Sequence, residues 1–298
     1  MPEGNEIHRW AERHAAAFAG RPMRVDGPQG RFTDSDVIDG RKLERVYAVG
    51  KHLGYDFGKD RILHVHLGLQ GDFTEGSGPL PEVKGALRLR MWNEQKVKKP
   101  AGESGSKPHR WYSEDDGTDN LPAEQIAWVE LRGPMDCSLY TQDKWDALRK
   151  KLGPDPLGDD PVWDKPERML AKVAKSRKPI AELLMDQTMF AGVGNIVRAE
   201  VLYRARLSPF RMGRDIEEKT LMAMWKDSGV LLQAGMVDRR LVSTKPADRP
   251  HKRGQALKEE AHYVYRRNGL PCFICGTVVK KEEMAGRNLF WCPTCQAE

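Results

Sequence analysis

The sequence predicts an α+β fold with a strand-rich first half, a helical second half and a metal ribbon at the C-terminus. Three observations predict it. Short apolar stretches separated by glycine and aspartate fill residues 21–92, a pattern typical of a β-sandwich or barrel. Helical periodicity replaces this pattern after residue 152. Two Cys-x-x-Cys pairs then close the chain.

The composition is that of a soluble protein able to bury a core. The 298 residues are 39% hydrophobic and 31% charged, which is enough for one large domain or two smaller ones. The net charge of +6 is compatible with an anionic partner but too small to identify one. The chain has no long apolar run, and its first residues are charged, so we expect neither a membrane span nor a secretion signal. We therefore expect a cytoplasmic protein.

The chain begins with Met1-Pro2-Glu3-Gly4, and the apolar spacing that follows predicts a helix over Glu6–Ala19. If Met1 is removed, Pro2 carries a secondary amine. An N-terminal amine titrates near ~8, so a neutral fraction exists at physiological pH. Such an amine can attack an aldehyde-like carbon and form an iminium. Proline is common at this position, so the motif alone means little.

Two turns of the strand-rich half carry candidate functional side chains. Lys51 follows Gly50 at a strand junction, while Leu69 and Gln70 lie in a glycine-bracketed turn after His66. By themselves these residues favour a solvated lysine and histidines that simply alternate on a sheet. The strands predicted from alternation and β-branched content are Met23–Val25, Leu43–Val49, Leu53–Phe57, Ile62–Leu67, Leu87–Trp92 and Ala127–Leu131.

Residues 93–125 are polar, with lysine-rich, glycine/serine and acidic patches. We expect this segment to be a long, mobile insertion. Cys137 follows it and is the one cysteine outside the C-terminal pairs. We expect Cys137 to be a buried, inert thiol.

A proline- and glycine-rich break at residues 152–156 marks the start of the helical half. Its tight turn Gly192-Val193-Gly194-Asn195 leads directly into a helix, so its amides can bind an anion, with Asn195 adding a side-chain donor. A Gly-x-Gly alone is weak support, since it usually marks only a turn. The predicted helices are Lys144–Lys151, Trp163–Ser176, Pro179–Asp186, Ile196–Ala205 and Thr220–Ala234.

The C-terminal cysteines have the spacing of a four-thiolate zinc ribbon. Two disulfides are the alternative, but nothing in the chain indicates secretion. Four thiolates leave no open coordination position, so the Zn²⁺ is predicted to be structural. The hairpin between the pairs carries Arg287 near its tip, where it suits a phosphate contact. The predicted ligands are Cys272, Cys275, Cys292 and Cys295.

Taken together, these motifs resemble the formamidopyrimidine-DNA glycosylase and endonuclease VIII family of DNA repair enzymes. The resemblance covers nearly the whole chain except residues 93–125. It rests on the order of Pro2-Glu3-Gly4, Gly50-Lys51, His66-Leu67-Gly68, Gly192-Val193-Gly194-Asn195 and the ribbon with Gly286-Arg287.

The resemblance implies a catalytic domain over residues 1–152, consisting of an N-terminal helix and a β-sandwich. It implies a helix–two-turn–helix DNA-binding domain over 153–262 and a zinc finger over 263–298. Double-stranded DNA with a damaged base or an abasic site is the implied partner. We expect the chain to act as a monomer.

The resemblance also implies a role for individual residues. Pro2 resembles the nucleophile, and Glu3 resembles the general acid/base that protonates the deoxyribose ring oxygen. Lys51 matches the catalytic-site lysine near the phosphate of the lesion. Asn195 and Arg287 match the residues that hold phosphates around the flipped nucleotide.

Departures from the guanine-lesion branch favour the endonuclease VIII side of the family. Leu69, followed by Gln70, stands where that branch has a gap-filling methionine, and residues 131–136 differ from its later arginine- and phenylalanine-bearing loop. The start Pro2-Glu3-Gly4-Asn5 also differs. The resemblance therefore implies excision of oxidised pyrimidines with β,δ-elimination. An 8-oxoguanine/formamidopyrimidine glycosylase and a non-catalytic zinc-ribbon DNA-binding protein remain as alternatives.

Overall fold

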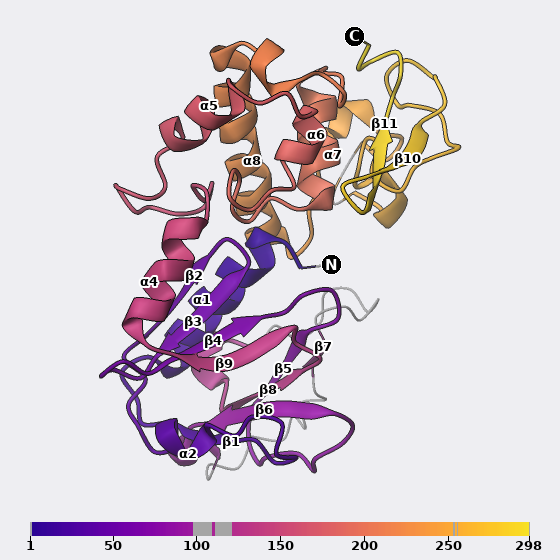
Figure 1. Cartoon of the computed structure of the whole chain (residues 1–298). Helices are drawn as coiled ribbons and strands as arrows, with labels where there is room; N and C mark the ends of the chain where they lie inside the picture. The colour runs from indigo at the N-terminus through magenta and orange to yellow at the C-terminus, as the bar shows by residue number, and fades with distance from the viewer. Residues whose placement is uncertain (1, 98–108, 111–120, 253, 255, 298) are drawn as a thin grey trace. The chain divides into compact units, whose positions relative to one another are not determined.

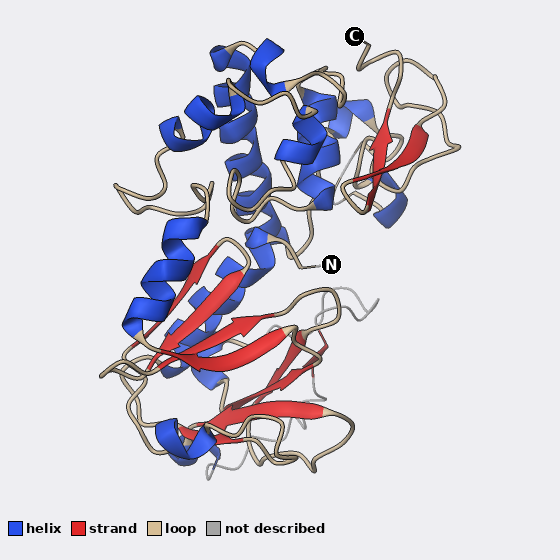
Figure 2. Cartoon of the chain, in the orientation of Figure 1, coloured by secondary structure: helices blue, strands red, loops and turns tan. Residues whose placement is uncertain are grey.

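The computed structural model describes residues 2–97, 109–110, 121–252, 254 and 256–297. The chain forms two compact units, the first made of Met1–Pro2 with Ile7–Leu148 and the second of Glu3–Glu6 with Arg149–Glu298. Helix α1 (Gly4–Phe18) therefore begins with residues of the second unit and continues in the first. Figure 2 shows that the first unit holds two sheets, whereas the second is mainly helical and ends in a hairpin.

The first unit contains two antiparallel sheets, as the predicted sandwich requires (Figure 1). The five-stranded sheet has the order β1-β6-β8-β5-β7, formed by Arg24–Asp26, Leu87–Trp92, Trp128–Arg132, Asp72–Gly76 and His109–Arg110. The four-stranded sheet has the order β2-β3-β4-β9, formed by Arg45–Val49, His52–Asp56, Ile62–His66 and Asp136–Tyr140.

All six predicted strands are present, with ends that differ by two residues or fewer. Strands β5, β7 and β9 were not predicted. Strand β5 has the sequence Asp-Phe-Thr-Glu-Gly, in which Asp, Glu and Gly are residue types depleted in strands. It forms because Phe73 is buried in the core and buried Glu75 pairs with Arg13 of α1.

The core of the first unit lies between the inner faces of the sheets and α1. Trp10 and His14 of α1 contact Phe73 of β5, and His14 also stacks on Tyr55 of β3. One helix thus packs against both sheets. Cys137 is buried in this core, as predicted, and burial raises the pKa of its thiol to about 12.

Short helices connect the strands of the first unit. They are α2 (Ser35–Ile38), α3 (Glu94–Val97) and the 3-10 turn η1 (Ala123–Gln125), whereas α4 (Gln142–Lys151) follows the last strand, β9. Helix α3, strand β7 and η1 lie in the predicted insertion 93–125. Residues 98–108 and 111–120 of that insertion lie outside the described residues, so its mobility stays a prediction.

The second unit contains α5 (Glu167–Val173), α6 (Ile180–Leu183), α7 (Asn195–Arg204) and α8 (Glu218–Asp238). Helix α5 is shorter than predicted because Pro166, at its N-cap, follows a loop tied to the Asp160 and Asp164 carboxylates. Helix α8 is longer than predicted and ends at Asp238, and its C-cap residue Arg239 is in the left-handed region, with φ 59°. Within the described residues, no helix is long and apolar enough to cross a membrane.

The second unit also contains short 3-10 turns: η2 (Gly213–Asp215) precedes α8, while η3 (Pro246–Asp248) and η4 (Lys258–Glu260) follow it. Buried Glu200 of α7 anchors the end of the segment after α8. Its carboxylate accepts the backbone N–H groups of Tyr263, Val264 and Tyr265 at 2.7–3.0 Å. The path of the chain into the C-terminal ribbon is therefore fixed from α7.

Candidate functional site

The carboxylate of Glu3 binds the N-terminus of α7 within the second unit. Its two oxygens accept the backbone N–H groups of Ile196 at 2.7 Å and Val197 at 3.2 Å. The side chain is 1% exposed. Unpaired amides at a helix N-terminus favour negative charge, so this contact orients the Glu3 carboxylate.

Two glycines make this approach possible. Gly192 has φ +84° and its carbonyl accepts the N–H of Gly4 at 2.9 Å. A Cβ on Gly194 would lie 2.5 Å from Oε1 and 2.6 Å from Cγ of Glu3. The Gly-x-Gly turn therefore does more than reverse the chain, because it leaves room for the glutamate.

The predicted anion site at this turn thus has an occupant from the chain itself. The anion at the amides of Ile196 and Val197 is the carboxylate of Glu3. Asn195 is buried and its side-chain amide donates to the carbonyl of Asn288 at 3.0 Å. The role of Asn195 in binding a phosphate stays a prediction.

Arg198 links the start of α7 to the C-terminal hairpin. It is fully buried and donates to Asn195 Oδ1, to the Met284 carbonyl at 3.3 Å and to the Asn288 carbonyl at 3.2 Å. Burial lowers its pKa to about 10, although the charge of Glu3 opposes this shift. The guanidinium thereby holds both strands of the hairpin.

The hairpin places Arg287 directly after its turn, as predicted. Strands β10 (Lys280–Met284) and β11 (Arg287–Trp291) pair in register through a two-residue turn. Ala285 and Gly286 both have positive φ, 54° and 67°, which is the geometry of tight hairpin turns. Arg287 is exposed there, whereas Leu289 and Trp291 of β11 pack into the helical core.

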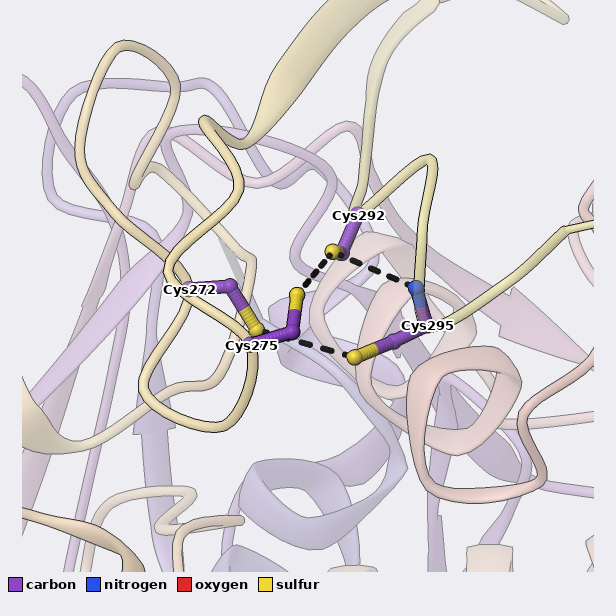
Figure 3. A group of neighbouring side chains, drawn as sticks. All are labelled: Cys272, Cys275, Cys292 and Cys295. Carbon is purple, nitrogen blue, oxygen red and sulfur yellow. Dashed lines mark hydrogen bonds between the residues drawn. The ribbon is translucent and has the colours of Figure 1, made fainter.

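The four predicted cysteines come together at the base of this hairpin (Figure 3). All four Sγ atoms lie within 4.8 Å of one another. The Cys272–Cys295 and Cys275–Cys292 pairs are 3.8 and 3.4 Å apart. A tetrahedron of Zn–S bonds of about 2.3 Å requires S···S distances near 3.8 Å. The four thiol groups therefore fit one structural zinc ion.

Hydrogen bonds around the sulfurs also suit a thiolate cluster. The hydroxyl of Tyr203 on α7 lies 3.0 Å from Cys272 Sγ, and the Cys295 N–H donates to Cys292 Sγ at 3.4 Å. Donors to a ligand sulfur stabilise its charge and orientation. The metal site is thus tied to the same helix that binds Glu3.

The first unit holds the remaining predicted residues, Pro2 before α1 and the others on tight turns between strands. Pro2 precedes the first turn of α1 and is buried. Lys51 lies in the two-residue turn between β2 and β3, in which Gly50 has φ 59°. Leu69 and Gln70 are exposed in the turn between β4 and β5, closed by the bond from Gly71 N–H to the Leu67 carbonyl.

Met135 is a candidate that the sequence did not reveal. It is 70% exposed, and Leu69 is 60% exposed. The Met135 N–H donates to the His66 carbonyl at 2.8 Å, and a Cβ on Gly68 would lie 2.8 Å from the Met135 Cβ. The two turns therefore pack together and present two apolar side chains to solvent. No local signal marked Met135, because its neighbour is distant in sequence.

Three family models match the chain. One described as the formamidopyrimidine-DNA glycosylase N-terminal domain matches residues 1–100. The formamidopyrimidine-DNA glycosylase H2TH domain matches 152–245, and a zinc finger found in FPG and IleRS matches 269–297.

Relatives extend this similarity along the whole chain. Endonuclease 8 1 of Mycobacterium tuberculosis (strain ATCC 25618 / H37Rv) is 39% identical over 302 residues, covering 99% of this chain and 100% of the relative. The formamidopyrimidine-DNA glycosylase of Thermus thermophilus is 36% identical over 303 residues, covering 100% and 99%.

Solved structures share the fold. MutM (Fpg) from Thermus thermophilus has a TM-score of 0.71 at 25% identity, covering 100% of this chain and 99% of that chain. Lactococcus lactis Fpg in complex with DNA containing an abasic site has a TM-score of 0.71 at 20% identity, covering 99% and 100%.

Fold and site together define a DNA glycosylase with AP lyase chemistry, containing a structural zinc finger. The chain belongs to the formamidopyrimidine-DNA glycosylase and endonuclease 8 family. The alternative of a zinc-ribbon DNA-binding protein without catalysis does not agree with this membership.

Removal of the zinc is expected to disorder the hairpin and release Arg287 from its fixed position. Structural zinc contributes about 10–16 kcal/mol to the folding of zinc-finger peptides, far more than this small hairpin supplies alone. Chelation should therefore lower DNA binding and strand cleavage in parallel with zinc loss, measured by metal content and a cleavage assay on the same sample. Full cleavage by zinc-free protein would show that the ribbon is dispensable.

Proposed function

We propose that the chain is a bifunctional DNA glycosylase of base excision repair that removes oxidised pyrimidines from double-stranded DNA and cleaves the strand. The observation that carries the proposal is the fixed carboxylate of Glu3, held by two amides at the start of α7. Pro2 precedes it in the chain. A nucleophile and a general acid/base on adjacent residues suit attack on a sugar carbon.

In the proposed reaction, the damaged nucleotide is first flipped out of the duplex. The neutral nitrogen of Pro2 bonds to C1′, and the base leaves with its bonding electrons and gains a proton. The Glu3 carboxylate takes the N–H proton from the newly charged Pro2 nitrogen and passes it to the ring oxygen O4′. The nitrogen lone pair then forms the C=N bond as the C1′–O4′ bond breaks, which gives the iminium. Loss of a C2′ proton then expels the 3′ phosphate, and a second elimination expels the 5′ phosphate.

The remaining predicted residues receive binding roles. Lys51 acts at the catalytic site, near the phosphate of the lesion, and Asn195 contacts a phosphate next to it. Leu69 and Gln70 enter the gap left by the flipped nucleotide, and the exposure of Met135 beside Leu69 supports a shared role for it. We also propose a monomer with the domains 1–152, 153–262 and 263–298, because every role falls on one chain.

The preference for pyrimidine lesions is supported by the similarity to endonuclease 8 1 at 39% identity. A second candidate is an 8-oxoguanine/formamidopyrimidine glycosylase, supported by the 36% identity to a relative of that name. Both share the same chemistry, so only the substrate separates them.

Borohydride trapping tests the iminium intermediate, and a comparison of damaged duplexes tests the lesion preference. A covalent adduct with abasic-site DNA, on protein whose intact mass lacks Met1, is expected from an iminium intermediate. Duplexes with thymine glycol and with 8-oxoguanine opposite cytosine then compare the two substrates. Faster release of 8-oxoguanine would reverse the assigned preference, and the absence of any adduct would refute the iminium route.

Arg287→Ala is expected to weaken DNA binding by about 1–3 kcal/mol and to reduce the salt dependence by about one phosphate contact. The reason is that an exposed arginine after a fixed turn contributes charge without contributing to the core. Binding titrations over a range of salt concentrations measure both quantities. Lys281→Ala on the paired strand is a control for charge alone. An unchanged affinity and salt slope in Arg287→Ala would contradict the phosphate role.

A further inference from the structure

A chain of hydrogen bonds crosses one face of the four-stranded sheet in the first unit. His64 on β4 is 2% exposed, and its Nδ1 lies 3.0 Å from Asp136 Oδ2 on β9. Its Nε2 lies 2.9 Å from Nδ1 of His52 on β3. Neither His52, His64 nor Asp136 has a place in the proposed chemistry.

The chemistry of these groups fixes the position of each proton. Ser138 donates to the other Asp136 oxygen at 2.9 Å, and Tyr140 donates to Oδ2 at 3.3 Å. Although burial opposes it, these bonds and His64 keep the pKa of Asp136 below its usual range. The ionised carboxylate can only accept, so His64 carries its proton on Nδ1.

The same reasoning extends to His52. Burial lowers the pKa of His64, and it lowers the pKa of His52 to about 3, so both rings are neutral. With its proton on Nδ1, His64 offers Nε2 as an acceptor, and His52 must donate from Nδ1. His52 is thereby held as one tautomer, with Nε2 as an acceptor.

The His52 end of the hydrogen-bond chain lies at the base of the two turns that carry Lys51 and Leu69. His52 directly follows Lys51, and its cross-strand partner is His66, which leads into the turn of Leu69. The rings of His52 and His66 are 4.8 Å apart. The ring of His64 also stacks on Tyr140 and contacts Trp145 of α4.

We propose that the Asp136–His64–His52 hydrogen-bond chain positions the Gly50–Lys51 turn against the His66–Leu69 turn. These three are positioning residues and contact no substrate in this assignment. The role in turnover rests on the proposed function, whereas the proton positions do not. Lys51, His66, Tyr140 and Lys144, whose ammonium lies over the Tyr140 ring, are the other ionisable groups facing the chain.

Nitrogen NMR of the histidine rings tests the Asp136–His64–His52 hydrogen-bond chain without any assay of activity. In the full-length protein, His64 and His52 are expected to carry their protons on Nδ1. Asp136→Ala should release His64 into a mixture of tautomers, while Asp143→Ala, which removes an exposed carboxylate from α4, should not. A proton on Nε2 of His64 in the unchanged protein would overturn the proposal.

Single-turnover cleavage of abasic-site DNA tests the positioning role. Asp136→Ala is expected to slow cleavage about tenfold or more, because small misplacements of a reacting group are costly. DNA affinity should fall much less than the rate, because Asn195 and Arg287 keep their proposed phosphate contacts and only the Lys51 turn is displaced. Asp136→Asn should recover the rate, because its amide oxygen can accept from His64 while its NH₂ donates to Ser138 Oγ. An altered tautomer with an unchanged rate would overturn the positioning role.

Two further variants keep the test decisive if Asp136→Ala does not fold. His52→Asn retains a donor near the position of Nδ1, whereas His52→Leu removes it. Cleavage retained in the first and slowed in the second supports the proposal, and equal rates contradict it. If the unchanged protein forms no adduct on abasic DNA, the proposed function fails, and the NMR result still decides the hydrogen-bond chain.

Discussion

Protein that retains Met1 is expected to form no covalent adduct with abasic-site DNA under borohydride. In that form the nitrogen of Pro2 is an amide, whose lone pair is delocalised into the carbonyl and cannot attack C1′. A protein freed of Met1 has a secondary amine that titrates near ~8, so part of it is neutral at physiological pH. Trapping yields for the two forms, each verified by intact mass, give the comparison directly.

Pro2→Gly tests whether catalysis needs the secondary amine of the proline ring or only an N-terminal amine. It leaves a primary amine, which gives an imine that is charged only when protonated, whereas a secondary amine gives a permanently charged iminium. We expect base excision to be lost, while DNA binding stays because the phosphate contacts lie on other residues. Normal excision by either altered protein would rule out Pro2 as the nucleophile.

Features that depend on local pattern could be predicted from the sequence. The Cys-x-x-Cys spacing alone predicted the four sulfurs that come together in Figure 3. Alternation predicted β6 to the residue, because its two faces differ in burial. Strand β9 was missed because Asp136 and Ser138 are polar and hydrogen-bond on the face of the sheet that carries His64, which reduces the apolar signal.

Features that depend on distant contacts could not be predicted in this way. The turn before α7 was expected to bind an external anion, yet the residue that binds its amides is Glu3, almost two hundred positions earlier in the chain. The role of Arg198 could not be predicted for the same reason, since its hydrogen-bond partners Met284 and Asn288 come from the distant C-terminal hairpin. A motif therefore indicated the kind of site, while the structure identified its occupant.

Gly194→Ala is expected to abolish base excision without unfolding the protein. Gly194 has φ −124° and ψ −162°, a conformation that alanine adopts freely, so the backbone itself is not strained. The added Cβ would lie 2.5 Å from Glu3 Oε1 and must displace the carboxylate from the amides of Ile196 and Val197. Loss of a positioned general acid/base costs about 10²–10⁴-fold in rate.

The measurement is single-turnover excision beside a thermal melt. Gly229→Ala in α8 is the matched control, because it adds the same methyl group in the second unit, where the nearest atom is the Pro156 carbonyl oxygen at 3.1 Å. We expect the control to keep its rate. A variant Gly194→Ala that melts normally and excises normally would show that Glu3 does not need this pocket. If Gly194→Ala loses both its excision rate and its normal melting temperature, the loss of activity would come from lost stability. Glu3→Gln, whose side chain fits the same space, would then test the carboxyl group alone. Its excision rate should fall, because an amide cannot protonate the ring oxygen.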